Sequence, residues 1–338
     1  MVDARRRRRQ ITWSIPLAER GQFVGEGEHA EVAVAVVTYN SAYDMPTLIN
    51  DLRRDARTMA LRLVVVDNDS QDGSADLVAA EEDIVLIRSD RNLGFGAGVN
   101  EARTRIGPCS AVLILNPDMR VREHAVERML ASLRRSGVGA VVPLNITGAD
   151  GAIDPTLRRE PSIMRALGDA IGGGRRFPCR PGWLSETDMR PDSYTREHAV
   201  DWATGSVMLI RADVDESVGN WTEEFFMYSE EIDYCRRIRE QGHLVWFDPT
   251  AVFEHPGGGG GSGRSTALAT LQTVNRIRYV EGRHGKAYAT VFRAVVLLSA
   301  VIRSHRRPHR GSLRFIINRD RWRDLPAAPV PVEQRQAP

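Results

Sequence analysis

The sequence contains few cysteines, and they lie far apart. Cys109, Cys179 and Cys235 are the only three among 338 residues, and none of them has the spacing of a metal-binding motif. Disulfide-rich secreted domains need paired cysteines, whereas isolated thiols are typical of a reducing compartment. The chain is therefore expected to be cytoplasmic and to lack a cysteine-bound zinc site.

Long hydrophobic runs are absent too. No segment approaches the roughly 20 apolar residues that a membrane-spanning helix requires, and the five arginines at 5–9 precede no apolar core that would make them a signal peptide. Residues 291–302 are apolar but short, and basic residues follow them. This segment is either a core helix with a solvated basic tail or an interfacial helix on an anionic membrane surface. An interfacial helix would place the protein peripherally on the inner face of the plasma membrane.

Neither sign of charge dominates the chain. It has 46 basic and 44 acidic residues, which argues against a general nucleic-acid-binding protein. Lys286 is the only lysine, so arginine supplies nearly all of the positive charge. The hydrophobic and charged fractions, 42% and 27%, are those of a globular protein, and the length suits one large domain or two ordinary ones.

What the sequence does contain is a repeated alternation of buried strands and helices. Apolar runs predict strands at residues 31–38, 61–66, 84–88 and 111–115, and the segments around them predict helices at 45–58, 75–81 and 97–105. Such alternation produces right-handed βαβ units. We therefore expect an α/β fold with a mostly parallel, nucleotide-binding sheet flanked by helices.

The second half of the chain is less regular. Proline, glycine and arginine dominate residues 155–191, which predicts a long surface excursion. A strand is expected at 202–211, a helix within 223–241 and a short strand at 244–247. Residues 257–261 are all glycine, and Ser262, Arg264 and Ser265 beyond them could close over a diphosphate.

The fourth predicted strand runs directly into Asn116-Pro117-Asp118. Proline cannot donate a ladder hydrogen bond, so the strand ends there and Asp118 is delivered to the carboxyl edge of the sheet. A carboxylate at that edge suits a divalent cation that bridges to substrate phosphates, although the same three residues also favour an ordinary turn. His255, beside the glycine loop, is either structural or a further ligand of that cation.

Polar or glycine-rich segments follow the other strands as well. Asn40 and Asp67 end the first two, where a carboxylate can accept a hydrogen bond from a base or a ribose hydroxyl; an Asx turn is the alternative. Gly94, Gly96 and Gly98 follow the third strand and open a helix. Their spacing is not the dinucleotide fingerprint, but it lets the backbone approach a phosphate or sugar closely.

Acidic residues cluster near the start of the helix expected within 223–241. Ser229 is placed to cap this helix, which puts Glu230 and Glu231 in its first turn, where the helix dipole favours carboxylates. A partly desolvated glutamate can also act as a general base. These residues alone leave capping and catalysis both open.

Taken in this order, the motifs resemble those of the family 2 glycosyltransferases, particularly the bacterial rhamnosyltransferase-like branch. The matching segments, within about residues 31–265, are 36–40 (VVTYN), 65–70 (VVDNDS), 91–100 (RNLGFGAGVN), 115–118 (LNPD), 204–206 (TGS), 226–233 (FMYSEEID) and His255. Each motif is weak by itself, but together and in register they are specific. The resemblance implies a GT-A fold and an inverting transfer from a nucleoside diphosphate sugar.

The resemblance also implies a role for each matching residue. Thr38, Asn40 and Asp67 would hold the nucleoside, and Asp118 would bind Mg²⁺ or Mn²⁺ with His255 as the next candidate ligand. Glu231 occupies the place of the family's catalytic Asp, one methylene longer, and this departure leaves Glu230 and Asp233 as alternative bases. The remaining residues expected at the nucleotide sugar are Asp69, Arg91, Asn92, Gly94, Asn116 and Gly205, with Asn116 standing where the family's first carboxylate usually lies.

Substrates and domain limits follow from the same resemblance. The branch favours dTDP-L-rhamnose as donor and a lipid-linked or cell-surface glycan as acceptor, as in cell wall biogenesis. A natural-product acceptor with another sugar donor, an NAD(P)-dependent oxidoreductase built on residues 94–98, and a catalytically silent scaffold are the competing hypotheses. The expected organisation is a flexible basic tail (1–30), a glycosyltransferase domain (31–265) with a nucleotide-binding half (31–120) and an acceptor half (121–265), and a C-terminal helical region (266–338).

Overall fold

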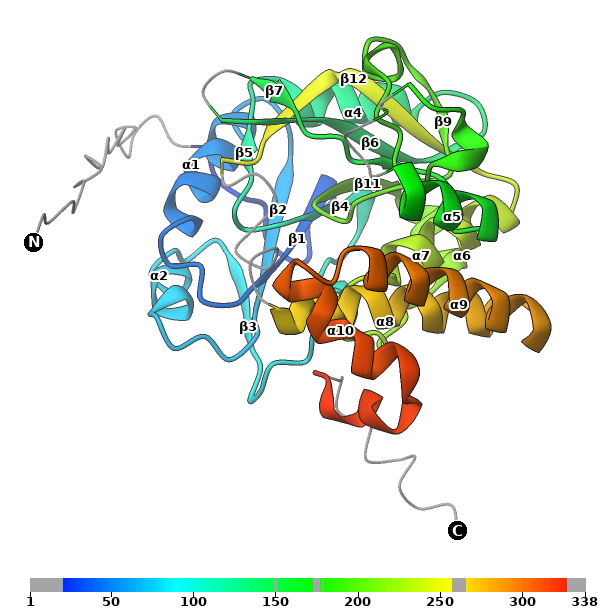
Figure 1. Ribbon diagram of the computed structural model, residues 1–338. Coiled ribbons are helices and arrows are strands. Elements are labelled where there is room, and N and C mark those ends of the chain that lie inside the picture. Colours follow the sequence, from blue (N-terminus) through cyan, green and yellow to red (C-terminus); the bar gives the residue numbers. More distant parts are fainter. Residues whose placement is uncertain (1–20, 149–150, 173–176, 178, 257–265, 327–338) are drawn as a thin grey trace, which may run out of the picture.

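Four parallel strands form the first half of the central sheet in the computed structural model, which describes residues 21–326 except 149–150, 173–176, 178 and 257–265 (Figure 1). The strands are β1 (Ala30–Thr38), β2 (Leu61–Asp67), β3 (Val85–Arg88) and β4 (Cys109–Leu115), in the spatial order β3-β2-β1-β4. All of β2 is buried, as expected of a strand covered on both faces. The α/β fold and the parallel arrangement of these four strands are confirmed, with strand ends within two residues of those predicted.

Helices cover both faces of these strands. Side chains of a strand alternate between faces, so Val34 and Val36 of β1 pack with α1 (Met45–Asp55), whereas Ala35 and Val37 lie in the second core with α3 (Phe95–Arg103). The short helix α2 (Ser74–Ala79) follows β2. The two cores hold the carboxyl ends of β1, β2 and β4 at one edge of the sheet.

Beyond β4 the sheet is mixed. β11 (Val207–Arg211) is antiparallel to both β4 and β6 (Val138–Thr147), and β12 (Leu244–Glu254) then runs parallel to β6. β12 is longer than the predicted strand at 244–247, because a register shift between Asp248 and Val252 accommodates Pro249. The remaining elements of this half are β5 (Arg120–Val121), α4 (Ala125–Leu133), β7 (Ala152–Ile153), β9 (His198–Val200) and α6 (Ala212–Val218).

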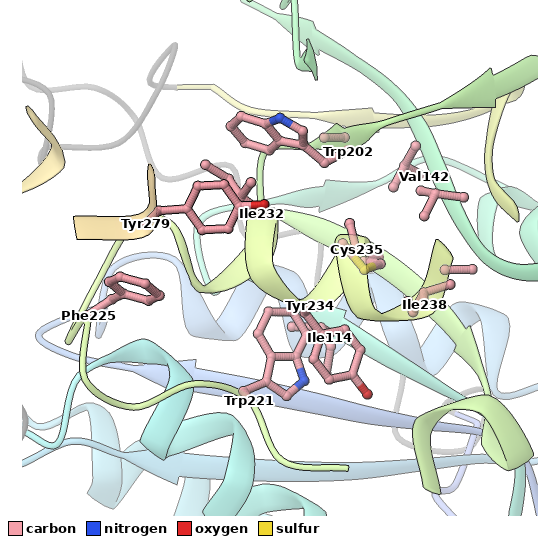
Figure 2. Close-up of a cluster of buried hydrophobic side chains, with 14 of the residues drawn as sticks. Ile114, Val142, Trp202, Trp221, Phe225, Ile232, Tyr234, Cys235, Ile238 and Tyr279 are labelled. Atoms are coloured by element: carbon pink, nitrogen blue, oxygen red, sulfur yellow. The ribbon is translucent and has the colours of Figure 1, made fainter. Parts of the chain in front are cut away.

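Two elements of the second half are shorter than the segments predicted for them. The strand predicted at 202–211 is broken at 204–206 into β10 (Trp202–Ala203), which pairs with β8 (Leu157–Arg158), and β11. The helix predicted within 223–241 is α7 (Glu230–Glu240), which begins directly after Ser229 as expected. The residues before it are left-handed, since Phe226, Tyr228 and Ser229 have positive φ angles of 62°, 70° and 81°. Figure 2 shows α7 enclosed by aromatic side chains, with Trp202, Trp221 and Tyr279 around Ile232, Tyr234 and Cys235.

The segment 155–191 is not a loose surface excursion. It contains β8, α5 (Ile163–Gly172) and the 3-10 turns η2 (Gly182–Leu184) and η3 (Pro191–Tyr194), and α5 packs along α9 (Lys286–Ile302). Its proline and glycine content reflects the turns between these short elements. The chain ends in a helical layer of α8 (Thr266–Arg283), α9, α10 (Arg307–Ile317) and the 3-10 turn η5 (Arg319–Asp324), seen in yellow to red in Figure 1.

The limits of the predicted regions fall partly outside the described residues. Part of the predicted tail is packed, since Phe23 is buried and its N–H donates to Asp83 (3.0 Å); residues 1–20 lie outside the described part, as do the glycines at 257–261 and Ser262, Arg264 and Ser265. Among the described residues, no helix is long and apolar enough to cross a membrane. The proposed domain boundaries stay a prediction.

Candidate active site

Two buried oxygen atoms lie side by side at the carboxyl edge of β1 and β2. Thr38 and Asp67 are register partners at the ends of these strands. Asp67 Oδ2 accepts a hydrogen bond from the Ser70 N–H (3.0 Å), but Asp67 Oδ1 and Thr38 Oγ1 have no partner among the described residues. Leaving buried polar atoms unpaired is costly, so this pair fits a ligand that supplies hydroxyl or N–H donors.

The neighbouring polar residues shape the loops of this edge. Asn40, with a φ of 54°, accepts from the Gln71 N–H (2.8 Å) and donates its own N–H to Ser70 (2.9 Å), which ties the β1 loop to the β2 loop. Asp69 accepts from the Gln71 side chain (3.1 Å). Asn40 and Asp69 are therefore engaged in bonds between and within these loops, whereas Asp67 keeps an oxygen for a ligand.

The three glycines after β3 are required by contacts inside the protein. A Cβ atom at Gly94 would collide with the Phe226 carbonyl oxygen, one at Gly96 would lie 2.8 Å from the Thr222 carbonyl oxygen, and one at Gly98 would lie 2.7 Å from a methyl group of Val37. From the sequence, these glycines are expected to let the backbone approach a phosphate or sugar closely. The structure shows an additional reason, because α3 enters the fold against the segment 222–226 and against β1. A role of Gly94 at the nucleotide sugar stays a prediction.

The loop before these glycines is more open. Asn92 accepts a hydrogen bond from the Gly94 N–H (2.9 Å), so it shapes the entry to α3. Arg91 is more than half exposed and only loosely paired with Asp90 (4.0 Å), which leaves its guanidinium accessible. A role of either residue at the nucleotide sugar stays a prediction.

Asp118 and His255 meet although 137 residues separate them. Asp118 Oδ2 lies 3.1 Å from His255 Nε2, and Asp154 Oδ2 lies 3.7 Å from His255 Nδ1. Burial opposes protonation of the imidazole, but the two carboxylates outweigh it and raise the pKa of His255 to about 9. Within the described part of the chain, no three His, Cys, Asp or Glu side chains form a complete metal cluster.

The Asp118–His255 pair nevertheless fits a divalent cation shared with a ligand. A carboxylate suits Mg²⁺ or Mn²⁺ and an imidazole is a common ligand of transition metals, so a cation could replace the hydrogen bond between them. Asp154 on the far ring nitrogen orients the imidazole, as second carboxylates commonly do at metal sites. Phosphate oxygens and water would complete the coordination.

Glu230 and Glu231 are buried carboxyl groups at the start of α7. They are only 4% and 8% exposed, and the Oε2 atom of each lacks a partner among the described residues. Burial, followed by the neighbouring charge of Glu231, raises the pKa of Glu230 well above its usual range. Burial also raises the pKa of Glu231, to about 7. Ser229 does not cap α7 through its side chain, contrary to the expectation from sequence, because its backbone is left-handed.

Asp233, one turn further, has a different environment. Its carboxylate accepts from Thr222 (2.6 Å) and from Arg237 (2.9 Å), and it also pairs with Arg283. Burial opposes ionisation, but these donors prevail and lower the pKa of Asp233. A carboxylate whose oxygens are already committed to cations is a structural ion pair and a poor proton acceptor.

Gly205 links the glutamates to the end of β4. The Asn116 N–H donates to the Ser206 carbonyl oxygen (2.9 Å), and a Cβ at the adjacent Gly205 would lie 3.5 Å from the Cβ of Glu231. Glu230 instead faces α3, since a Cβ at Gly96 would lie 3.7 Å from its Cβ. Of the two glutamates, Glu231 is therefore the one beside the Asn116–Asp118 turn.

Asn275 is a functional candidate that the sequence analysis missed. It is fully buried on α8, and its amide nitrogen donates to the carbonyl oxygens of Phe225 (2.6 Å), Met227 (2.8 Å) and, more weakly, Tyr228 (3.4 Å). These bonds hold the left-handed segment that leads into Glu230. The sequence does offer one indication of this role. Asn275 is an amide on the face of α8 that otherwise buries the apolar residues Leu271 and Val274.

The raised pKa of Glu231 predicts a pH-dependent stability difference. The folded chain holds this proton more tightly than the unfolded chain, so its contribution is present below about pH 4.5 and is lost as the pH rises to about 7. Glu231→Gln should therefore gain on the order of 2–3 kcal/mol relative to wild type between pH 5 and pH 8. Urea unfolding at both pH values measures this, with Glu216→Gln on the exposed side of α6 as control. An equal difference at both pH values would contradict the assignment.

Comparisons with known proteins agree with this geometry. Residues 33–186 match the model of glycosyl transferase family 2. An N-acetylglucosaminyl-diphospho-decaprenol L-rhamnosyltransferase of Mycobacterium tuberculosis is 27% identical over 309 residues, which cover 85% of this chain and 98% of that protein. The low-salt glycan biosynthesis hexosyltransferase Agl10 of Haloferax volcanii is 29% identical over 62% of each chain.

Solved structures show the same fold. The mannosyltransferase PcManGT from Pyrobaculum calidifontis, in complex with GDP-Man and Mn²⁺, superposes with a TM-score of 0.52 at 15% identity over 88% of both chains. GalNAc-T7 with UDP, GalNAc and Mn²⁺ gives a TM-score of 0.56 at 14% identity over 85% of this chain and 56% of that one. The oxidoreductase hypothesis is therefore wrong, and residues 94–98 serve packing between α3 and its neighbours. The chain is therefore a sugar-transferring enzyme with the GT-A fold, and its residues 33–186 are similar to glycosyl transferase family 2.

Proposed function

We propose that this enzyme is a divalent-metal-dependent, inverting glycosyltransferase that moves L-rhamnose from dTDP-L-rhamnose to a hydroxyl group of a lipid-linked or cell-surface glycan. The observation that carries the proposal is the buried Glu231 carboxyl group, which lies beside the Asn116–Asp118 turn. Asp118 in this turn is paired with His255. The Mycobacterium tuberculosis relative, whose name specifies rhamnose transfer to a decaprenol-linked sugar, supports this donor and acceptor class.

The nucleotide end of the donor would lie at the β1–β2 edge. Thr38 and Asp67 hold their free oxygens toward it and would accept hydrogen bonds from the base or the ribose. Asp118 and His255 would hold Mg²⁺ or Mn²⁺, which when bound offsets the charge that grows on the departing diphosphate. The same arrangement would keep the sugar between the diphosphate and α7.

Glu231 would act as the general base. Its carboxylate would take the proton of the acceptor hydroxyl while that oxygen bonds to the anomeric carbon and the bond from this carbon to the diphosphate breaks. In-line attack from the opposite side inverts the configuration. A pKa near the working pH suits this role, because the base is then ionised yet still basic. Glu230 faces α3 and Asp233 is ion-paired, so both are weaker candidates for the base.

Two substitutions test the roles of the site in transfer. Glu231→Gln should lower kcat by about 10²–10⁴ through loss of the base, and Asp118→Ala should abolish the stimulation of transfer by Mn²⁺. Release of nucleoside diphosphate from a panel of sugar donors, with and without acceptor, measures both effects. Glu216→Gln is the matched surface control, and circular dichroism checks the fold.

Each outcome of this experiment has a defined meaning. Full turnover by both variants would refute the site assignment, and nucleotide binding without any sugar release by the wild type would favour a silent scaffold. Turnover with a donor other than dTDP-L-rhamnose, or on a small natural product only, would replace the substrate proposal while retaining the mechanism.

The pH dependence of transfer should follow the ionisation of Glu231. Below about pH 7 its carboxyl group is protonated and cannot accept the hydroxyl proton, so kcat/KM should rise with unit slope toward a plateau above that pH. Steady-state rates between pH 5 and pH 9 at saturating Mn²⁺ give the profile. A flat profile across this range would mean that a group with an ordinary carboxyl pKa is the base.

Asn275 should act as a positioning residue for Glu231. Asn275→Asp keeps the size of the side chain but turns a donor toward three carbonyl oxygens into an acceptor, so the loop before Glu230 should loosen. We expect kcat to fall by at least about tenfold with little change in the donor KM, because the β1–β2 edge is untouched. The midpoint of the pH profile should also move down, since a hydrated Glu231 loses its burial.

The control for this experiment is Thr273→Ala, on the same helix and away from the loop, which donates to the Ala269 carbonyl oxygen. A purely structural role of Asn275 would lower the stability and leave the midpoint of the pH profile where it is. That result would show that Asn275 does not position Glu231.

A further inference from the structure

Helix α9 has two apolar faces. One face is buried in the core through Phe292, Val296 and Ala300. The opposite face carries Val291, Leu298, Val301 and Ile302, which are each between 45% and 52% exposed and lie within one stripe of the helix at the 3.6-residue period. A surface helix normally presents charged residues to water, but α9 contains only Lys286 and Arg293, and neither belongs to this stripe.

Further exposed apolar residues lie at the same end of the molecule. Ile171, at the end of α5, is 73% exposed, and Phe177 lies just beyond it with 58% exposure. The Arg303 side chain joins the two helix ends, because it donates both to the Asp169 carbonyl oxygen of α5 and to Ser299 of α9. Figure 1 shows α5 and α9 running side by side at the edge of the molecule.

Positive charge lies at one end of this apolar surface, and most of it is unpaired among the described residues, although Arg319 pairs with Glu281 (2.6 Å). Residues 287–319 contain seven arginines and no aspartate or glutamate. Arg306, Arg307, Arg310 and Arg314 are exposed, and none of them pairs with a carboxylate in the described part of the chain. A surface that is apolar in the middle and cationic at one end has the pattern of an interfacial membrane helix.

We propose that the outward stripe of α9, with Ile171 and Phe177, rests in the interface of an anionic phospholipid bilayer, and that the arginines after α9 bind the lipid headgroups. The surface is called the α9 face below. α9 would lie in the membrane plane, since its 17 residues span about 25 Å at 1.5 Å per residue and no described helix can cross the bilayer. A second copy of the chain fits less well, because an isologous contact would bring the two arginine clusters together.

The α9 face is connected to the active site through the helical layer. Phe226 and Tyr228, in the loop before Glu230, pack against a hydrophobic cluster that includes Leu271 of α8 and Phe315 of α10. The biological purpose of this docking rests on the proposed function. An enzyme docked through α9 would meet a lipid-linked acceptor at the membrane surface. Binding to the bilayer is itself a property of the chain that does not depend on the identity of the acceptor.

Co-sedimentation of the full chain with vesicles tests the proposal. Vesicles of phosphatidylcholine alone are compared with vesicles that also contain phosphatidylglycerol, at low and high salt. We expect binding to the anionic vesicles that weakens with salt. Leu298→Gln with Val301→Gln, and separately Arg306→Gln with Arg310→Gln, should each reduce the partition coefficient by at least about tenfold.

Matched controls are available elsewhere on the surface. Leu77→Gln with Ile153→Gln removes two comparably exposed apolar residues, and Arg134→Gln with Arg196→Gln removes two exposed arginines. Both control pairs should bind vesicles as the wild type does. A third variant with residues 5–9 changed to glutamine should retain most of the binding, since the α9 face remains.

Four results would overturn the proposal. They are absence of binding to anionic vesicles at low salt, equal losses in the control pairs, complete loss in the 5–9 variant, and a dimer in sedimentation velocity that Leu298→Gln with Val301→Gln dissociates. Release of nucleoside diphosphate from the donor without acceptor should be unchanged in every α9 variant, which separates a failure of membrane docking from a failure of the proposed function.

Discussion

The site depends on one strained connection, the segment from Phe225 to Ser229. Three of its residues are left-handed, which costs roughly 1–2 kcal/mol for each residue that carries a Cβ. The segment keeps this conformation because Asn275 binds its carbonyl oxygens on one side and the Phe95 N–H donates to the Phe226 carbonyl oxygen (2.6 Å) on the other. The direction in which α7 starts, and therefore the position of Glu230 and Glu231, follows from these bonds.

The same connection explains why the nucleotide edge and the glutamates form one site. Asn68, next to Asp67, donates to the Gly94 carbonyl oxygen (2.9 Å), and the following residue, Phe95, bonds to the Phe226 loop. A side chain at Gly94 would force this loop away. The β2 edge, α3 and α7 are thus held in register by the Asn68 side chain and by a backbone hydrogen bond between Phe95 and Phe226.

Much of the fold could be predicted because buried parallel strands have a strong signature. The runs before Asp67 and Asp118 are apolar throughout and end in residues that stop a strand, so both carboxylates could be placed at the sheet edge from sequence. The glycines at 94–98 were located from sequence, but their packing role was not foreseen, since no local pattern reveals that Phe226 and Thr222 lie against them. The start of α7 after Ser229 was predicted, but the left-handed backbone before it was not, because Tyr228 and Ser229 have no strong preference for that conformation that a sequence would show.

The choice of base lies beyond local sequence for a related reason. Glu230, Glu231 and Asp233 are similar in the sequence, and they differ only in what distant elements bring to them. Arg283 from α8 and Arg237 form ion pairs with Asp233, whereas the Oε2 atoms of Glu230 and Glu231 have no hydrogen-bond partner among the described residues, and Arg158 acts on Glu231 only through its charge. Burial of these glutamates without a directly bonded cation lowers the stability of the ionised enzyme, and it is the condition under which a carboxylate can accept a hydroxyl proton.

The C-terminal helices bring together two properties that the sequence suggested only as alternatives. Residues 291–302 were expected to form either a core helix or an interfacial one, and the structure shows a helix that is buried along one face and apolar along the other. The buried face is needed because α8, which packs on α9, carries Asn275 and Arg283 to the site. The exposed apolar face has no such role inside the protein, and its exposure to water has a free-energy cost that only a partner outside the fold can offset. If that partner is a bilayer, then the helical layer that positions Glu231 is also the layer that faces the source of a lipid-linked acceptor.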